Sequence, residues 1–246
     1  MRWYVLGLCL IGLIGCAAPT LEPLTEQQAH RAARANTDLA IHYLSRDALE
    51  PAAQKIYRAL VQNPNLIDAQ LVAAELNARL SKPALAEQHY RNALQIEADS
   101  GAALNNYAVF LCDRDQRLRA LDLWEMAANN PLYTGRAMAL TNAGRCLNAA
   151  GYADQARTYW RRALEVQAQY APALRAMAEE SLARDSLNTA RLYFSRYTHV
   201  SDETPTLLWL GVRIAKAGGD TERYEHFAQR LKDVYPLSDQ AAQLSE

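Results

Sequence analysis

Residues that could support catalysis or metal binding occur in the chain, but they are not spaced for either. The neighbouring acids Glu179 and Glu180 would point about 100° apart on a helix, so they cannot flank one bond as a catalytic carboxylate pair does. Gly218-Gly219 is expected to form a turn, and the sequence has no glycine-rich phosphate loop. The histidines lack metal-ligand spacing; they are His30, His42, His89, His199 and His226. We therefore expect no enzyme activity, no small-molecule substrate and no bound cofactor.

Cys16 is the residue with the clearest expected chemistry, because of the segment that precedes it. A positive charge at Arg2 and an apolar run over residues 3–14 lead into Leu13-Ile14-Gly15-Cys16, an order typical of a secretory signal. The run is shorter than the roughly 18–20 residues that a membrane-spanning helix needs. The tetrapeptide resembles a bacterial lipobox, in which the cysteine is lipidated and becomes the first mature residue. A plain signal peptide that contains a cysteine is the alternative.

The lipobox sets the expected location of the protein. Residues 1–15 would be removed as a lipoprotein signal peptide, and several acyl chains on Cys16 would anchor the protein stably in a membrane. Ala17 follows the cysteine where an aspartate would favour the inner membrane, so sorting to the outer membrane is expected. Residues 16–25 contain Pro19 and Pro23 and no amphipathic period, so they are expected to form a tether on the periplasmic face.

The net charge of the chain and its two remaining cysteines bear on nucleic-acid binding and on disulfide formation. The formal net charge is −1 and neither end is strongly acidic or basic, so the sequence shows no electrostatic footprint for nucleic acid. Cys112 and Cys146 would lie in an oxidising compartment, where a disulfide is chemically feasible. Both fall within helical patterns and two cysteines do not make a framework, so we favour two separate buried thiols over a bridge.

An alanine that returns at one interval predicts the fold. Ala52, Ala86, Ala120, Ala156 and Ala190 are separated by 34, 34, 36 and 34 residues. A second alanine follows seven residues after each of the first four, and a large side chain such as Trp124 or Trp160 lies between the two. This period and these offsets are the mark of the tetratricopeptide repeat, a pair of antiparallel helices. The sequence therefore predicts an all-α fold, a right-handed superhelical solenoid of about six such repeats.

The solenoid is expected to span residues 26–236. Its first helix should run from Glu26 to about Ser45, with Thr25 and Gln28 forming a capping box. The repeats are expected at residues 33–66, 67–100, 101–134, 137–170, 171–204 and 205–236, with two extra residues near Gly135-Arg136. The sixth repeat loses the alanine signature, as a terminal capping unit does. Residues 237–246 form a polar C-terminal tail that is expected to fray.

Specificity is expected on the concave face, which the first helix of each repeat lines at positions three or four apart. Near the N-terminus these positions are apolar, which indicates either core packing or a groove for a partner's amphipathic helix or added strand. In the middle they are rich in amides and include two arginines, which could engage an acidic segment. The candidate partner-binding residues are Ile41, Leu44, Leu71, Glu75, Asn105, Asn106, Val109, Thr141, Arg145, Asn148, Arg175 and Glu179.

Three segments are more distinctive than the generic repeat. They are residues 103–108 with 110–111, the insertion Asn130-Pro131-Leu132-Tyr133, and the last repeat at residues 207–216 and 231–236. Together with the lipobox and the short tether, these segments resemble the type IV pilus pilotin lipoproteins of the PilF/PilW family. The resemblance covers nearly all of the mature chain, and Cys112 and Cys146 depart from it.

The resemblance implies a lipoprotein that travels with the lipoprotein sorting machinery to the outer membrane. There it would help the secretin of the type IV pilus to insert and form its oligomeric ring, on which pilus emergence and twitching motility depend. Cys16 would carry the lipid, and the groove or the apolar patch at Ile41, Leu44 and Leu71 would hold the secretin subunit. Two alternatives stay open: a periplasmic scaffold that recruits peptidoglycan hydrolases or outer-membrane assembly factors, and an enzyme whose site is assembled only by the fold.

Overall fold

The computed structural model describes residues 24–245, and this part of the chain forms helices without strands. Within it, six antiparallel pairs of helices are followed by a short helix and a single 3-10 turn. The expected signal peptide, Cys16 and the part of the expected tether before Leu24 lie outside the described residues. The helices are α1 (Glu26–Leu44), α2 (Leu49–Gln62), α3 (Ile67–Arg79), α4 (Pro83–Ile96), α5 (Gly101–Cys112), α6 (Arg117–Asn129), α7 (Arg136–Ala149), α8 (Ala153–Val166), α9 (Ala171–Ala183), α10 (Leu187–Thr198), α11 (Pro205–Ala217), α12 (Thr221–Val234), α13 (Asp239–Ala242) and η1 (Gln243–Ser245).

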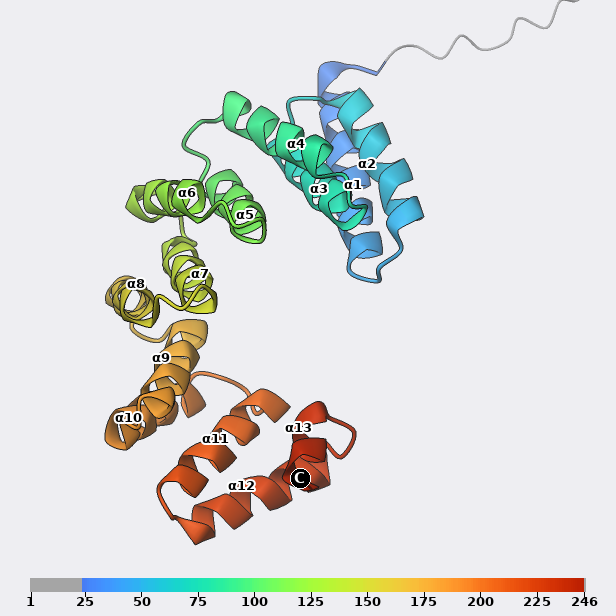
Figure 1. Ribbon diagram of the computed structural model, residues 1–246. Helices are drawn as coiled ribbons and strands as arrows, with labels where there is room; N and C mark the ends of the chain where they lie inside the picture. Colours follow the sequence, from blue (N-terminus) through green and yellow to red (C-terminus); the bar gives the residue numbers. More distant parts are fainter. Residues whose placement is uncertain (1–23, 246) are drawn as a thin grey trace, which may run out of the picture.

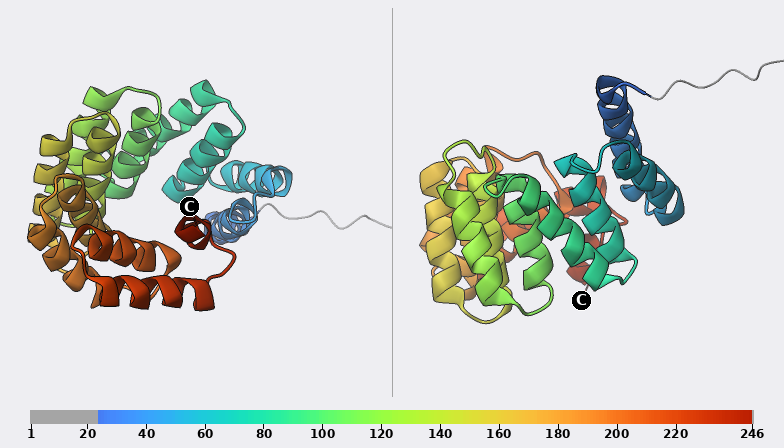
Figure 2. Two further views of the ribbon diagram at one scale, coloured as in Figure 1. Left: turned by 60° about the horizontal axis from the view of Figure 1, so that its bottom comes forward. Right: turned by 90° about the horizontal axis from the view of Figure 1, so that it is seen from above.

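The pairs stack side by side into a curved solenoid (Figure 1). The first helices α3, α5, α7 and α9 lie on the inner side of the curve, and the second helices lie on the outer side. Seen along the curve in the left view of Figure 2, the stacked pairs wind around an open centre. Among the helices described, none combines the length and the apolar composition that crossing a bilayer requires. The predicted all-α repeat solenoid is confirmed.

Small and large residues interlock between the helices at the positions that the sequence pattern indicated. Ala52, Ala86 and Ala120 are completely buried, as are their counterparts in the next repeats, Ala156 and Ala190. Trp124, which is 1% exposed, fills the space that these alanines leave beside it. Close packing of this kind needs the smallest side chains at fixed offsets, which is why the alanine period was visible in the sequence.

One position with a left-handed backbone reverses the chain between the two helices of each pair. It has φ between 55° and 86° and follows the same period; it is occupied by Asp47, Ser81, Asp115, Gly151, Asp185 and Gly219. Glycine adopts this conformation at no steric cost, and aspartate tolerates it better than most residues. The repeated turn gives every pair the same antiparallel arrangement.

The N-terminal helix is capped as its sequence indicates. Thr25 Oγ1 accepts a hydrogen bond from the backbone N–H of Gln28 at 3.3 Å, and Gln28 Oε1 accepts one from the backbone N–H of Thr25 at 2.9 Å. This capping box begins α1 at Glu26, and the helix continues for 19 residues to Leu44. Its first turns lie beside the end of α2, where Asn63 Nδ2 is 2.9 Å from His30 Nδ1.

The expectation that the C-terminal tail frays is wrong for the part that the structure describes. Ser238 caps α13 by accepting a hydrogen bond from the backbone N–H of Ala241 at 3.2 Å. Ala241 is 7% exposed, and Leu244 packs against the core formed by α10, α11 and α12. Two apolar residues in an otherwise polar segment therefore close the end of the core.

Candidate partner-binding site

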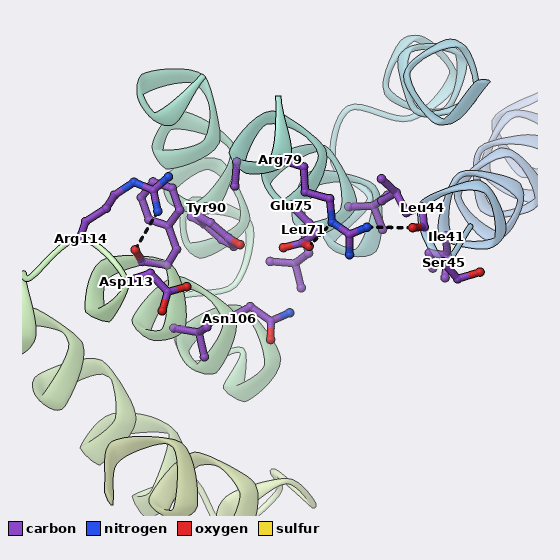
Figure 3. Close-up of a pocket in the computed structure, with 14 residues that line it drawn as sticks. Ile41, Leu44, Ser45, Leu71, Glu75, Arg79, Tyr90, Asn106, Asp113 and Arg114 are labelled. Atoms are coloured by element: carbon purple, nitrogen blue, oxygen red, sulfur yellow. Dashed lines mark hydrogen bonds and ion pairs between the residues drawn. The ribbon is translucent and has the colours of Figure 1, made fainter. Parts of the chain in front are cut away.

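The inner helices α1, α3 and α5, with Tyr90 of α4, enclose a hollow of about 430 Å³ that we call the N-terminal groove (Figure 3). It brings together six of the predicted residues from three different helices. The groove is lined by Ile41, Leu44, Ser45, Leu71, Val72, Glu75, Ala78, Arg79, Tyr90, Asn106, Val109, Phe110, Asp113 and Arg114.

The apolar residues of the N-terminal groove differ in how much surface they offer. Ile41 is 49% exposed, whereas Leu44 and Leu71 are only 6% and 8% exposed. Tyr90 lies beneath them at 3% exposure, and its burial raises the pKa of the phenol. Leu44 and Leu71 therefore belong mainly to the core, which agrees with the core-packing interpretation of these apolar positions. Of these three side chains, Ile41 is the one that a partner can cover.

Two arginines hold the polar rim of this groove in place. Arg79 donates one hydrogen bond to the carbonyl of Leu44 at 2.8 Å and another to Glu75 Oε1 at 2.7 Å, which ties α3 to the end of α1 (Figure 3). The guanidinium of Arg114 lies 3.8 Å from the centroid of the Phe110 ring and donates to the Phe110 carbonyl at 3.2 Å. These intramolecular contacts therefore fix the positions of the Arg79 and Arg114 guanidinium groups at the rim.

A second hollow of about 710 Å³, the C-terminal groove, lies between α7 and α9. Arg145 and Asn148 of α7 face Arg175 and Glu179 of α9 across it. Arg175 Nε is 3.9 Å from Glu179 Oε1, and both side chains are about 40% exposed, so this is a weak surface pair. All the predicted candidates except Asn105 therefore line one of two grooves, and those in the C-terminal groove all have polar side chains.

Asn105 and Thr141 were predicted to contact a partner, but the structure buries both. Asn105 is 3% exposed, and its Oδ1 accepts hydrogen bonds from Trp124 Nε1 at 3.2 Å and Asn142 Nδ2 at 3.0 Å. Thr141 is 8% exposed and donates its hydroxyl to the Ala137 carbonyl at 2.7 Å. Both residues are on the inner helices at the expected register, but the Asn105 amide joins α5 to α6 and α7, and the Thr141 hydroxyl bonds within its own helix.

The sequence interpretation missed Phe110, Asp113 and Arg114 as part of the N-terminal groove. They lie at the end of α5: Phe110 directly follows the predicted contact Val109, and Asp113 and Arg114 lie about one turn further along. The available signal was the i, i+4 spacing of Phe110 and Arg114, because side chains at that separation meet on a helix.

Cys112 and Cys146 form a disulfide bridge, so the expectation of two separate thiols is wrong. Their Cα atoms lie 6.1 Å apart, and the bridge joins the end of α5 to α7. These two inner helices contact each other although α6 separates them in sequence. The bridge therefore connects an element of the N-terminal groove to an element of the C-terminal groove.

Among the described residues, the ionisable groups with shifted pKa values lie outside the two grooves, except for Tyr90 and Tyr170, whose phenol pKa values are raised by burial. A hydrogen bond from Tyr107 and further ones from Arg119 and Arg91 lower the pKa of Glu87 against the opposing effect of burial. Arg162 donates to both carboxylate oxygens of Glu125, at 2.6 and 2.8 Å, and lowers its pKa. These contacts join successive pairs of helices.

In the part of the chain that the structure describes, no group of three His, Cys, Asp or Glu side chains is placed to hold a metal ion.

Known proteins share both the sequence and the arrangement of this chain. The type IV pilus assembly protein PilF of Pseudomonas aeruginosa is 27% identical over 240 residues, which cover 97% of this chain and 95% of PilF. An uncharacterized protein of Haemophilus influenzae is 25% identical over 139 residues, 56% of this chain and 76% of that protein. No protein-family model matches the chain.

Solved structures superpose on the same arrangement of repeats. The structure of P. aeruginosa PilF matches with a TM-score of 0.71 at 25% identity, covering 88% of this chain and 98% of PilF. The crystal structure of PilW, a widely conserved type IV pilus biogenesis factor, matches with a TM-score of 0.72 at 29% identity, covering 87% and 98%. A tetratricopeptide-repeat protein from Parabacteroides merdae shares the fold at 15% identity, with a TM-score of 0.61.

In the described residues, six helix pairs that repeat every 34 to 36 residues define a tetratricopeptide-repeat protein. The match to PilF and PilW extends over almost the whole of the described solenoid. The chain is a tetratricopeptide-repeat protein that is similar to PilF and PilW over nearly its whole length.

Proposed function

We propose that the protein acts in type IV pilus biogenesis as an outer-membrane lipoprotein, a pilotin, that binds the secretin subunit. Binding would promote the localisation and oligomerisation of the secretin, and twitching motility would depend on it. The kinship with PilF and PilW over nearly the full chain supports the role in the pilus. The lipobox at Cys16 supports a lipid anchor on the periplasmic face, delivered by the lipoprotein sorting machinery.

The N-terminal groove is the feature that supports secretin binding most directly. It combines the half-exposed Ile41 with a buried apolar floor and a rim that Arg79 and Arg114 fix. An apolar hollow of this kind suits the apolar face of a partner's amphipathic helix, which anchors through residues one turn apart. The groove is built by the repeats that follow the tether in sequence, so a bound subunit would be held close to the lipid anchor.

The pilotin role is tested on the secretin itself. Outer-membrane fractions from cells with and without the gene are compared on an immunoblot of unboiled samples. We expect the heat-resistant secretin multimer to disappear without the gene and to return when the wild-type gene is restored. An unchanged multimer would overturn the pilotin role and leave a general periplasmic scaffold as the leading function.

The lipid anchor is tested separately by Cys16→Ser. Without the thiol no acyl chain can be attached, so we expect the protein to leave the outer-membrane fraction while its folded solenoid persists. Cys9→Ser is the matched control, because Cys9 lies within the segment expected to be cleaved and its loss should leave the location unchanged. Retention of the Cys16→Ser protein in the outer membrane would contradict the anchor.

A further inference from the structure

The concave face changes its charge between its two halves. Acidic and basic side chains nearly balance around the N-terminal groove and the smaller hollow that continues from it; they are Asp38, Asp68, Glu75 and Asp113 against Arg34, Arg79 and Arg114. Basic residues dominate on the inner side of α7, α9 and α11. Since the whole chain has a net charge of −1, this basic character is a local property of the inner face.

The concave register of α9 continues onto α11. Positions 175, 179 and 182 recur 34 residues later as Trp209, Arg213 and Lys216, and α9 and α11 contact each other. Arg213 and Lys216 are exposed, while Leu208, Leu210 and Val212 on the other faces of α11 are buried. We call Arg145, Arg175, Arg213 and Lys216 the basic stripe; it runs along the inner face of three successive inner helices.

Few carboxylates neutralise the basic stripe. Glu179 is the acid at a concave position, and it lies 3.9 Å from Arg175. Glu180, which also borders the C-terminal groove, is 5% exposed and is already paired with Arg184 Nε at 2.6 Å. Within residues 24–245, Arg145, Arg213 and Lys216 have no carboxylate within the 4.0 Å of an ion pair. Four cations therefore face one loosely held carboxylate.

We propose that the basic stripe is a second docking surface, which binds an extended acidic segment of a protein partner. Guanidinium groups bind carboxylates in a fixed two-point geometry, and the exposed amide of Asn148 can bond to a peptide backbone beside them. An inward-curving face can follow a single peptide chain, whereas a flat bilayer cannot reach residues on its inner side. This surface is distinct from the N-terminal groove and does not depend on the identity of the partner bound there.

The probe for this surface is a fluorescein-labelled peptide of alternating glutamate and serine. Its binding to the purified protein is followed by fluorescence anisotropy at low and at physiological salt. We expect Arg145→Glu with Arg213→Glu to weaken binding at least about tenfold, and we expect added salt to weaken wild-type binding. Ile41→Asp, in the N-terminal groove, should leave binding of the peptide unchanged.

Arg58→Glu with Arg161→Glu is the matched control, because it makes the same change of charge on exposed residues of the outer helices α2 and α8. Thermal melting of both double variants checks that the solenoid is intact. Equal weakening by the control, or no binding of the peptide to the wild-type protein, would overturn the proposal. Binding to anionic vesicles that the stripe variants abolish, with no binding of peptide, would overturn it in favour of a lipid surface.

Discussion

Ile41→Ala tests whether the N-terminal groove holds the secretin through apolar contact. Ile41 is 49% exposed, so about half of its side chain is left for a partner to cover. Complete burial of an isoleucine contributes about 1.5–3 kcal/mol, so covering the exposed half contributes roughly 0.8–1.5 kcal/mol. Each 1.4 kcal/mol is a factor of ten in affinity, so Ile41→Ala should weaken secretin binding by about 3- to 10-fold.

Ile41→Asp should have a larger effect, because it leaves a charge where the bound partner excludes water. We expect it to weaken binding by about 100-fold or more. Leu39→Asp is the matched control: Leu39 is on the same helix, is 42% exposed, and lines neither groove. Leu44→Asp and Leu71→Asp are unsuitable, because at 6% and 8% exposure they would place a charge in the core and disrupt the fold.

The assay is the affinity of the purified protein for a soluble secretin fragment, measured by biolayer interferometry, with thermal melting as the check on folding. Ile41→Asp and Leu39→Asp should melt close to the wild-type temperature, and only Ile41→Asp should lose binding. Wild-type affinity in Ile41→Asp, or equal loss in Leu39→Asp, would refute the assignment of the secretin to this groove.

Three further predictions concern stability. A non-reduced tryptic digest should contain the peptide of Cys112 joined to that of Cys146, and unlinked peptides would contradict the bridge. Since the bridge spans 34 residues, the chain-entropy model predicts that Cys112→Ser lowers the free energy of unfolding, measured by urea denaturation, by about 3–4 kcal/mol. Arg162→Met removes the partner that lowers the pKa of Glu125 below 4.5, so its stabilisation is present above about pH 4.5 and lost as the pH falls through the lowered pKa. Because Arg162 and Glu125 are 35% and 33% exposed, the difference from wild type should be about 1 kcal/mol at pH 7 and should shrink as the pH falls through the lowered pKa of Glu125. A difference that does not shrink with falling pH would mean that packing, and not the ion pair, is responsible. Gly144→Ala would drive a Cβ into the indole of Trp160, which donates a hydrogen bond to the Thr141 carbonyl at 3.2 Å. We expect the free energy of unfolding to fall by about 1–3 kcal/mol. An unchanged melting temperature would disprove that contact.

The parts of the fold that depend on local pattern could be predicted from the sequence. The alanine period located the helix pairs because Ala52 and its counterparts are completely buried where helices approach most closely. The concave register brought Ile41, Glu75 and Val109 to one groove because they are 34 residues apart and each lies at the same place in its repeat. Both inferences needed only the repeat length and the geometry of a helix.

The parts that depend on how repeats are rotated against each other could not be predicted. Two extra residues before α7 make Cys146 the counterpart of Phe110 in the preceding repeat, so the repeat alignment gave no reason to pair it with Cys112. The burial of Asn105 likewise depends on the indole of Trp124, which approaches from α6 and donates its N–H to Asn105 Oδ1. Contacts of this kind are set by the packing of whole helices and leave no mark in the spacing of residues.

The most direct test of secretin binding in the N-terminal groove is photocrosslinking in living cells. A photoreactive amino acid is placed at position 41, and in a control strain at position 39, and the adducts are identified by immunoblot and mass spectrometry. We predict an adduct with the pilus secretin from position 41 and none from position 39. An adduct with a different protein from position 41, or crosslinking of the secretin from position 39 alone, would contradict the assignment.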